Sequence, residues 1–259
     1  MTTVLKLGGS LVTEKDRRET VDEAALGAAI DAIAEAEVGA KTAVGTGDDD
    51  DLVLVHGGGS FGHYHAEKYG VSADAGTRDA AAATAIHAAM KRLNDAVVDG
   101  LHDRGVPALP VHPFSAGVRG ADGGLTFPLE PVETMLGEGF VPVLHGDCVT
   151  QVEKGVTILS GDELVVRLAD GLTADRVGLC STVSGVLDGE GEVIPEIRAF
   201  ADAADALGGS DATDVTGGMA AKVRALLELD APSYVFGPEG LEAFLAGGSP
   251  GTRVERNAR

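Results

Sequence analysis

The chain has 259 residues, with 41 Asp or Glu against 20 Lys or Arg, and its formal net charge is -21. A field of this sign repels phosphate backbones and anionic headgroups, so nucleic acid and membrane surfaces are excluded as expected partners. Apolar residues make up 44% of the chain and Trp is absent, so we expect one large α/β core of Val, Leu, Ile and Ala.

The acidic residues are spread along the chain, while Ala and Gly abound and Lys is scarce. This is typical of proteins adapted to molar salt, where charges are screened over about 3 Å. An ordinary acidic cytosolic protein is the alternative. Cys148 and Cys180 lie far apart in apolar surroundings, which predicts reduced thiols. We see no signal peptide and no apolar run of membrane-spanning length, so we expect a cytoplasmic protein.

The chain opens with a strand pattern over residues 2–7 that contains Lys6. The strand is broken by a turn of small residues, Gly8, Gly9 and Ser10. A Lys in a buried strand is costly unless its ammonium group meets an anion, and backbone N–H groups of such a turn bind anions. Lys15 follows, before a helix predicted over residues 21–38. A snorkelling surface lysine is the alternative, but two lysines at one glycine turn favour a functional role.

The next strand pattern, residues 52–55, leads into a glycine-rich loop over residues 56–63, around which the chain is organised. Three successive glycines, residues 57–59, let the backbone reach positive φ and lie against a ligand. His63 adds a titratable donor at the far end. A tight turn without a ligand is the alternative. Residues 64–76 are expected to form a loop or a short helix that covers the site.

A long helix is predicted over residues 77–101, with an apolar stripe made by Ile86, Met90, Leu93 and Val97. We interpret the stripe as core packing, and a partial role in lining an apolar pocket is the alternative. We next predict a strand over residues 106–111, a hairpin over residues 113–127, a helix over residues 132–136 and a strand over residues 140–144. Gly146 and Asp147 follow the last of these, at the sheet edge where open α/β sheets bind ligands.

A strand over residues 156–159 precedes Ser160, Gly161 and Asp162, which open a helix predicted to end near residue 169. Ser160 is a good helix cap, and the helix dipole favours Asp162 in the first turn. Stabilisation of the helix therefore explains Asp162 completely. The functional alternative is that its carboxylate faces a cleft and holds two lysines or a magnesium-bound phosphate.

A last glycine turn directly precedes a helix predicted over residues 219–229. The helix N-terminus, Gly217 and Lys222 converge there, which suits a nucleotide phosphate. The remaining predicted elements begin with a strand over residues 176–180, which continues over residues 184–187. A hairpin over residues 188–194, strands over residues 233–236 and 252–254, and a helix over residues 239–245 follow.

Glycine-rich turns thus occur at Gly8, Gly57, Gly161 and Gly217, beside three lysines and one histidine. This number of anion-binding groups is larger than one phosphate needs. It suits two phosphorylated groups bound end to end, which is the geometry of phosphoryl transfer. The sequence contains neither the Walker pattern nor the catalytic loop of protein kinases.

The motifs resemble the amino acid kinase superfamily over essentially the whole chain. They are residues 6–10, 56–59, 160–162 and 216–219, with Lys222. Within the superfamily, residues 57–63 and 13–16 resemble the archaeal isopentenyl phosphate kinases. The acetylglutamate, carbamate, uridylate and aspartate branches have different residues after the glycines. The archaeal family often has Pro after the histidine, where this chain has Tyr64.

The resemblance implies a three-layer αβα sandwich with an open, mostly parallel sheet, in one domain over residues 1–259. The N-terminal half, about residues 1–150, would hold the phosphate acceptor and form a homodimer. The C-terminal half, about residues 151–259, would hold ATP, with Mg²⁺ carried by the nucleotide phosphates and no metal ligand from the protein. The implied reaction transfers a phosphoryl group from ATP to isopentenyl phosphate, late in an alternative mevalonate route.

The resemblance also implies roles for individual residues. Lys6 and Lys15 would contact the transferring phosphoryl group, and Asp162 would orient Lys6 and Lys222. The acceptor phosphate would bind His63 and backbone N–H groups of Gly58, Gly59 and Gly146. The ATP side would comprise Lys6, Gly8, Gly9, Ser10, Gly59, Asp162, Gly185, Gly217 and Lys222. The alternatives are a kinase of the same superfamily with a phosphonate or acetylglutamate-type acceptor, and a non-catalytic ligand-binding protein on this fold.

Overall fold

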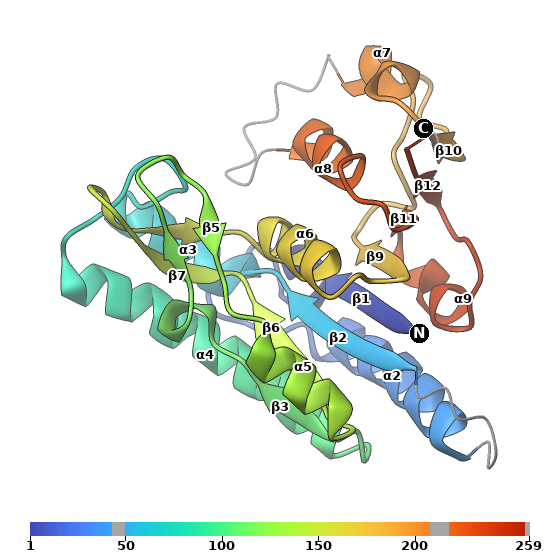
Figure 1. Cartoon of the computed structure of the whole chain (residues 1–259), viewed down its shortest axis with the longest axis horizontal. Coiled ribbons are helices and arrows are strands. Elements are labelled where there is room, and N and C mark those ends of the chain that lie inside the picture. Colours follow the sequence, from blue (N-terminus) through green and yellow to red (C-terminus); the bar gives the residue numbers. More distant parts are fainter. Residues whose placement is uncertain (43–49, 208–217, 257–259) are drawn as a thin grey trace.

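The computed structural model describes residues 1–42, 50–207 and 218–256. Within these residues the chain forms a large sheet of eight strands and a small sheet of four (Figure 1). The large sheet contains β1 (Thr2–Leu7), β2 (Asp51–His56), β3 (Ala108–Pro110), β6 (Val141–His145), β9 (Arg176–Cys180), β10 (Glu196–Ile197), β11 (Ser233–Phe236) and β12 (Thr252–Val254). Their order is β10-β12-β11-β9-β1-β2-β6-β3, and only the β11–β12 pair is antiparallel.

Helices cover both faces of this sheet and complete the three-layer αβα sandwich (Figure 1). One face carries α2 (Glu23–Thr42), α4 (Ala80–His102) and α9 (Leu241–Leu245). The other face carries α5 (Glu130–Gly137), α6 (Gly161–Gly171) and α8 (Gly218–Leu226). The predicted fold class is therefore confirmed.

Side-chain alternation along β1 explains how a lysine reaches the functional edge. Val4 packs on the α6 side, and Leu5 and Leu7 pack on the α2 side. Because successive side chains of a strand point to opposite faces, Lys6 lies on the same side as Val4. A strand that is buried on both faces is apolar throughout, so Lys6 is an exception that needs a partner.

The small sheet has the order β5-β4-β7-β8 and stands at the carboxyl edge of the large sheet. Its strands are β4 (Val118–Arg119), β5 (Leu125–Thr126), β7 (Asp147–Gln151) and β8 (Gly155–Leu159). The guanidinium group of Arg119 in β4 contacts both carboxylate oxygens of Glu163 in α6, which ties the small sheet to the start of that helix.

Most elements agree with the sequence-based predictions, including the hairpin of β4 and β5. Besides short elements such as β10, which were not predicted, three features differ. Strand β7 was not predicted, and it pairs with β8 across a turn in which Glu153 has a φ of 68°. Residues 184–187 form no strand; a bridge between Leu187 and Val193 closes the predicted hairpin instead.

The third difference concerns residues 56–63, which do not form one loop. His56 ends β2, and Gly59 already begins helix α3 (Gly59–Tyr69), so only Gly57 and Gly58 form the turn. The physical reason is a distant cap, because the Ser60 N–H donates to the Thr13 hydroxyl at 3.0 Å. His63 is therefore presented by a helix.

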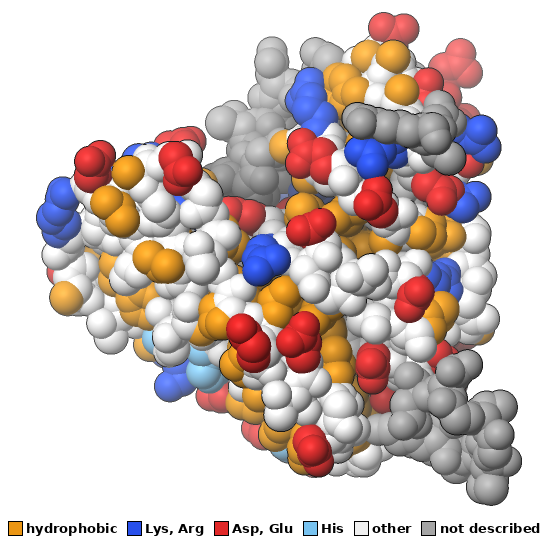
Figure 2. All heavy atoms as spheres, viewed as in Figure 1, with side chains coloured by type: hydrophobic (Ala, Val, Ile, Leu, Met, Phe, Trp, Pro, Cys, Tyr) orange, Lys and Arg blue, Asp and Glu red, His pale blue; other side chains and the backbone are white. Residues whose placement is uncertain are grey.

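The remaining described helices are short. They are α1 (Gly9–Val12), α7 (Ala204–Leu207), η1 (Pro113–Ser115), η2 (Phe200–Ala203) and η3 (Pro238–Gly240). On the face drawn in Figure 2, acidic side chains are spread over several elements. This distribution agrees with the absence of an acidic tail in the sequence.

Candidate active site

A cleft of about 1090 Å³ lies at the carboxyl ends of β1, β2 and β9. It is lined by all five residues predicted to be catalytic, which are Lys6, Lys15, His63, Asp162 and Lys222. The predicted glycines and serine that also line it are Gly8, Gly9, Ser10, Gly58, Gly59 and Gly146. Residues far apart in the sequence thus share one cleft, as expected where parallel strands end at one sheet edge.

Asp162 stands between two lysines. Lys6 Nζ lies 2.5 Å from Asp162 Oδ1, and Lys222 Nζ lies 3.6 Å from Asp162 Oδ2. The side chain of Asp162 is 15% exposed and that of Lys6 is 10% exposed, so solvent screens this pair weakly. Ser160 caps the helix by accepting the Glu163 N–H at 3.1 Å. Both explanations offered for Asp162 therefore hold, because it lies in the first turn of α6 and also bridges the two lysines.

Two glycine turns pack backbone against backbone and form the floor of the cleft. A Cβ added to Gly9 would lie 2.2 Å from the Gly59 nitrogen, and one added to Gly57 would lie 2.6 Å from the Gly9 nitrogen. Gly59 also has a φ of 46°. The glycines at these positions are therefore required by close approach of two chain segments as well as by any ligand.

This packing gives a prediction for stability. Gly59→Ala should lower the free energy of unfolding by at least about 2 kcal/mol, because its Cβ would meet the Thr13 hydroxyl at 2.1 Å and the Gly9 carbonyl at 2.6 Å. Gly70→Ala is the matched control, because Gly70 has a φ of 63° and open space around it. Its cost should be only the roughly 1 kcal/mol of the left-handed backbone. Equal losses in urea unfolding would contradict the steric explanation.

Lys15 is exposed and lies on a loop closed by a bridge between Thr13 and Val21. The loop is fixed at Glu19, whose carboxylate contacts His65 at 2.8 Å and also contacts the guanidinium group of Arg92. Burial alone would raise the pKa of Glu19, but hydrogen bonds from His65, Arg92 and Arg18 lower that pKa to about 2. Glu19 therefore remains a carboxylate and holds the Lys15 loop against α3 and α4.

No sequence pattern predicted this anchor. Glu19 was not singled out, and its φ of 47° is uncommon for a residue with a side chain. Arg18 was not predicted either, although it lines the cleft and lies over the Tyr64 ring at 4.1 Å. Tyr64, the residue that departs from the archaeal pattern, thus supports the rim of the cleft beside the Lys15 loop.

His63 projects from α3 at a point where the cleft also has apolar walls. These walls are formed by Ala66, Ile86, Met90 and Ile158. Met90 approaches α3 closely, because a Cβ on Gly62 would lie 2.8 Å from its sulfur. The predicted apolar stripe is therefore divided: Ile86 and Met90 reach the cleft, and Leu93 and Val97 are buried in the core.

Three of the glycines predicted to bind substrate or nucleotide differ from the others: Gly146, Gly185 and Gly217. The Gly146 N–H donates to the His56 carbonyl at 3.0 Å, because the β2–β6 pairing continues one residue past the strands. Gly146 also lines the cleft, and its contact with a phosphate stays a prediction. Gly185 is buried against Val193 and Thr252 and does not line the cleft. Gly217 lies outside the described residues.

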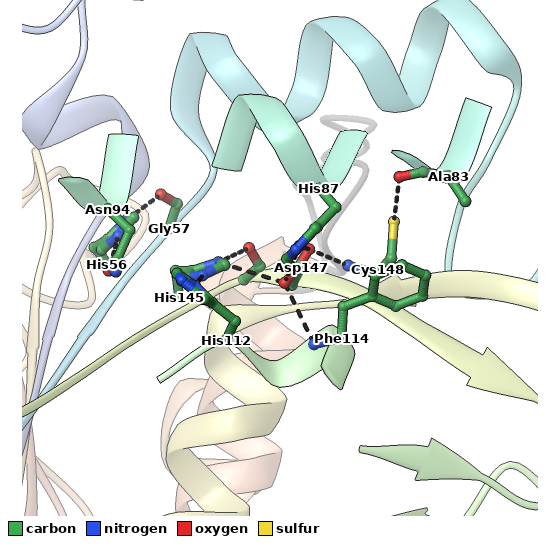
Figure 3. Close-up of polar contacts among 11 residues, drawn as sticks. His56, Gly57, Ala83, His87, Asn94, His112, Phe114, His145, Asp147 and Cys148 are labelled. Carbon is green, nitrogen blue, oxygen red and sulfur yellow. Dashed lines mark hydrogen bonds and ion pairs between the residues drawn. The ribbon is translucent and has the colours of Figure 1, made fainter. Parts of the chain in front are cut away.

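A row of histidines, of which His56 and His145 are buried and His87 and His112 half-buried, runs from the end of β2 to Asp147 (Figure 3). His56 and His145 occupy paired positions at the ends of β2 and β6, and their rings stack at 5.5 Å. His145 Nε2 lies 2.9 Å from His112 Nδ1, and His87 Nδ1 lies 2.9 Å from a carboxylate oxygen of Asp147. The sequence analysis did not identify this group.

Burial lowers the pKa of His56 to about 4, and burial also lowers those of His112 and His145. Below pH 6.5 the unfolded chain takes up these protons while the folded protein stays neutral, so stability falls as the pH drops toward about 4. For His56 alone the full loss is about 3 kcal/mol. Urea unfolding at pH 7.5 and pH 5 in the same molar salt should show about 2 kcal/mol of this loss. Equal free energies of unfolding at the two pH values would refute this prediction.

The sequence pattern described as the Amino acid kinase family matches residues 1–229. The chain belongs to this family. It is 67% identical over 251 residues to isopentenyl phosphate kinase of Haloferax volcanii, with 97% of each chain covered. Identity to the isopentenyl phosphate kinase of Methanocaldococcus jannaschii is 32%, over 91% of this chain and 90% of that one.

A solved structure described as isopentenyl phosphate kinase matches this amino acid kinase with a TM-score of 0.80 and 26% identity. The match covers 98% of this chain and 100% of the solved one. Membership in the family implies a phosphotransferase that uses ATP. No helix in residues 1–42, 50–207 or 218–256 combines the length and apolar character needed to cross a bilayer.

Proposed function

We propose that this kinase transfers the γ-phosphoryl group of ATP to isopentenyl phosphate, giving ADP and isopentenyl diphosphate. The observation that carries the proposal is the position of Asp162 between Lys6 and Lys222, in the same cleft as Lys15 and His63. The chain is 67% identical to isopentenyl phosphate kinase of Haloferax volcanii, which supports isopentenyl phosphate as its substrate.

The acceptor is a phosphate monoester, whose second pKa is about 6. It is largely a dianion at neutral pH, so its oxygen attacks the γ-phosphorus without a general base. The task of the protein is to hold two anions together and to stabilise charge on the transferring group. His63 would donate to the acceptor phosphate, and Lys15 would bridge it to the transferring phosphoryl group.

The Gly58 and Gly59 N–H groups complete the proposed acceptor site. The first N–H groups of a helix have no partner within it, and α3 begins at Gly59. Among the described residues, neither N–H has a protein acceptor. Both glycines line the cleft, so these donors are available to an anion there.

On the ATP side, Lys6 and Lys222 would contact phosphate oxygens while Asp162 fixes their directions. Backbone N–H groups of Gly9, Ser10 and Gly217 would contribute further donors in this proposal. Mg²⁺ is usually held by substrate phosphates, water and one or two carboxylates. Asp162 is already paired with two ammonium groups, which fits a metal ion carried mainly by the nucleotide.

The apolar walls of the cleft suit the hydrocarbon tail of isopentenyl phosphate. Ile86, Met90 and Ile158 lie beside the helix that carries His63. Burying such a tail stabilises the complex by about 25 cal/mol per Å² of apolar surface removed from water. A carboxylate acceptor such as acetylglutamate would instead call for polar groups along these walls.

We also propose a cellular compartment, a pathway and an oligomeric state for the enzyme. The acidic surface suits a cytoplasm of molar salt, and a place in isoprenoid synthesis by a mevalonate route follows from the substrate. A homodimer formed by the N-terminal half, within a single domain, belongs to the same proposal. Gel filtration with light scattering in molar KCl tests the dimer.

The decisive experiment measures ADP release in molar KCl with ATP and Mg²⁺. Isopentenyl phosphate, acetylglutamate, an alkyl phosphonate and no acceptor are compared. Turnover with isopentenyl phosphate alone is expected. Turnover with acetylglutamate or the phosphonate instead would indicate another kinase of the family, and no turnover with any acceptor would indicate a ligand-binding protein.

A further inference from the structure

His56 is a fully buried histidine directly before the glycine turn of the acceptor site. Leu52 and Leu54 of the same strand face α4, and alternation places His56 on that side. Its ring has two polar contacts, drawn in Figure 3. Nδ1 lies 3.1 Å from the Gly57 carbonyl oxygen, and Nε2 lies 3.0 Å from Asn94 Oδ1 in α4.

The direction of these hydrogen bonds follows from the chemistry of the groups. Burial lowers the pKa of His56 to about 4, so the ring is neutral at neutral pH and carries one N–H. The Gly57 carbonyl only accepts, so the hydrogen is on Nδ1 and Nε2 is an acceptor. Asn94 Oδ1 faces Nε2 in the structure, but two acceptors cannot bond each other, so we turn the amide over and let Nδ2 donate to Nε2. This orientation also gives a partner to Nδ2, which is otherwise a buried donor without one.

The peptide between Gly57 and Gly58 is the first one after β2 that no neighbouring strand holds. The Gly57 N–H donates to the Leu7 carbonyl at 3.0 Å, and the His56 carbonyl accepts the Gly146 N–H. Past these bonds, the Gly57 carbonyl has no backbone donor among the described residues. A Gly-Gly peptide rotates easily because no Cβ restricts it, so the imidazole is what fixes its orientation.

This orientation determines where a cleft donor points. The described chain has no cis peptide bonds, so the carbonyl of Gly57 and the N–H of Gly58 point in opposite directions. The carbonyl is held toward the buried ring of His56, and Gly58 lines the cleft. The Gly58 N–H is therefore directed away from the core and into the cleft.

We infer that His56, anchored by Asn94, is a positioning residue that aims the Gly58 N–H at the phosphate of the acceptor. The inference rests on the proposed function, because it takes the acceptor phosphate to bind at this turn. His56 itself does not line the cleft, so it acts through the peptide. A pre-aimed donor costs nothing to reorganise when the anion binds, which is the condition for strong electrostatic stabilisation.

Two substitutions of the same residue separate positioning from packing. His56→Asn places an amide N–H near the position of Nδ1, whereas His56→Gln reaches the position of Nε2 and leaves the Gly57 carbonyl without a donor. His56→Gln should raise the KM for isopentenyl phosphate roughly 10-fold or more, as expected for one hydrogen bond to a charged group. The KM for ATP should stay within about 2-fold, and His56→Asn should recover most of the loss.

His102→Asn is the matched control, because Asn reaches only the position of Nδ1 and so removes a bond that Nε2 makes. The His102 ring also binds a backbone carbonyl, with Nε2 2.8 Å from the Ala108 oxygen, at the other end of α4. Its removal should leave both KM values unchanged. If His56→Gln does not fold, Asn94→Leu replaces it, because it removes the anchor of the ring and should raise the same KM selectively.

Equal KM values for the two His56 variants, or parallel increases for ATP and isopentenyl phosphate, would overturn the inference. Binding of inorganic phosphate, measured by calorimetry without ATP, separates this result from failure of the proposed function. Weaker phosphate binding by His56→Gln supports the positioning role even if wild-type protein phosphorylates a different acceptor. Unchanged phosphate binding overturns it.

Discussion

Lys15→Ala is expected to lower kcat by about 10²–10³ and to leave the melting temperature unchanged. The side chain of Lys15 is exposed and lines the cleft, and the loop that carries it is held at Glu19. Removing the ammonium group should therefore remove the positive charge that we propose for the reacting phosphates, without disturbing the core. Steady-state kinetics and a thermal melt of the same preparation measure both parts of the prediction.

Arg17→Ala provides the control for this prediction. Arg17 lies on the same loop and is also a cation, but it pairs with Glu14 at 3.0 Å and does not line the cleft. Its replacement should change kcat by less than about 2-fold, since an exposed ion pair contributes little. A Lys15→Ala variant that is unfolded, or that turns over at the wild-type rate, would remove Lys15 from the mechanism.

Asp162→Asn should lower kcat by about 10² or more and raise the KM for ATP, with a small effect on the KM for isopentenyl phosphate. The carboxylate pairs with Lys6 at 2.5 Å and with Lys222 at 3.6 Å. An amide of the same shape cannot neutralise two ammonium groups, so the lysines repel one another and lose their fixed directions. Kinetics with each substrate varied in turn test the split between the two KM values.

Asp170→Asn is the matched control on the same helix. Asp170 is exposed near the C-terminal end of α6, where the helix dipole disfavours a negative charge. This change should be neutral or slightly stabilising and should leave kcat unchanged. If Asp162→Asn behaved in the same way, Asp162 would have only the helix-stabilising role that its place in the first turn explains.

The cleft residues that were predictable from the sequence are those whose position follows from local pattern. Lys6 stands in the first strand before a glycine turn, and Asp162 stands just after a helix cap. Parallel strands bring such positions to one edge of a sheet, so the contact between Lys6 and Asp162 follows although they are 156 residues apart.

The parts that were missed depend on contacts without a local signal. The cap of α3 comes from Thr13, 47 residues before Ser60, and the ring of His56 is anchored by Asn94, 38 residues further on. Asn94 did leave one sign, since it is a polar residue on the buried side of α4. The hydrogen bond from the Gly146 N–H to the His56 carbonyl could not be seen either, because it results from pairing between β2 and β6.

The place of β1 in the large sheet has a consequence for how the chain folds during synthesis. β1 is made first, and it can pair with β2 once residue 56 has left the ribosome, but its other neighbour, β9, begins only at Arg176. Until then one edge of β1 is open, which invites association between nascent chains. Lys6 places a charge on that edge. The lysine that we propose for phosphoryl transfer in the finished enzyme is therefore also expected to discourage aggregation of the unfinished one.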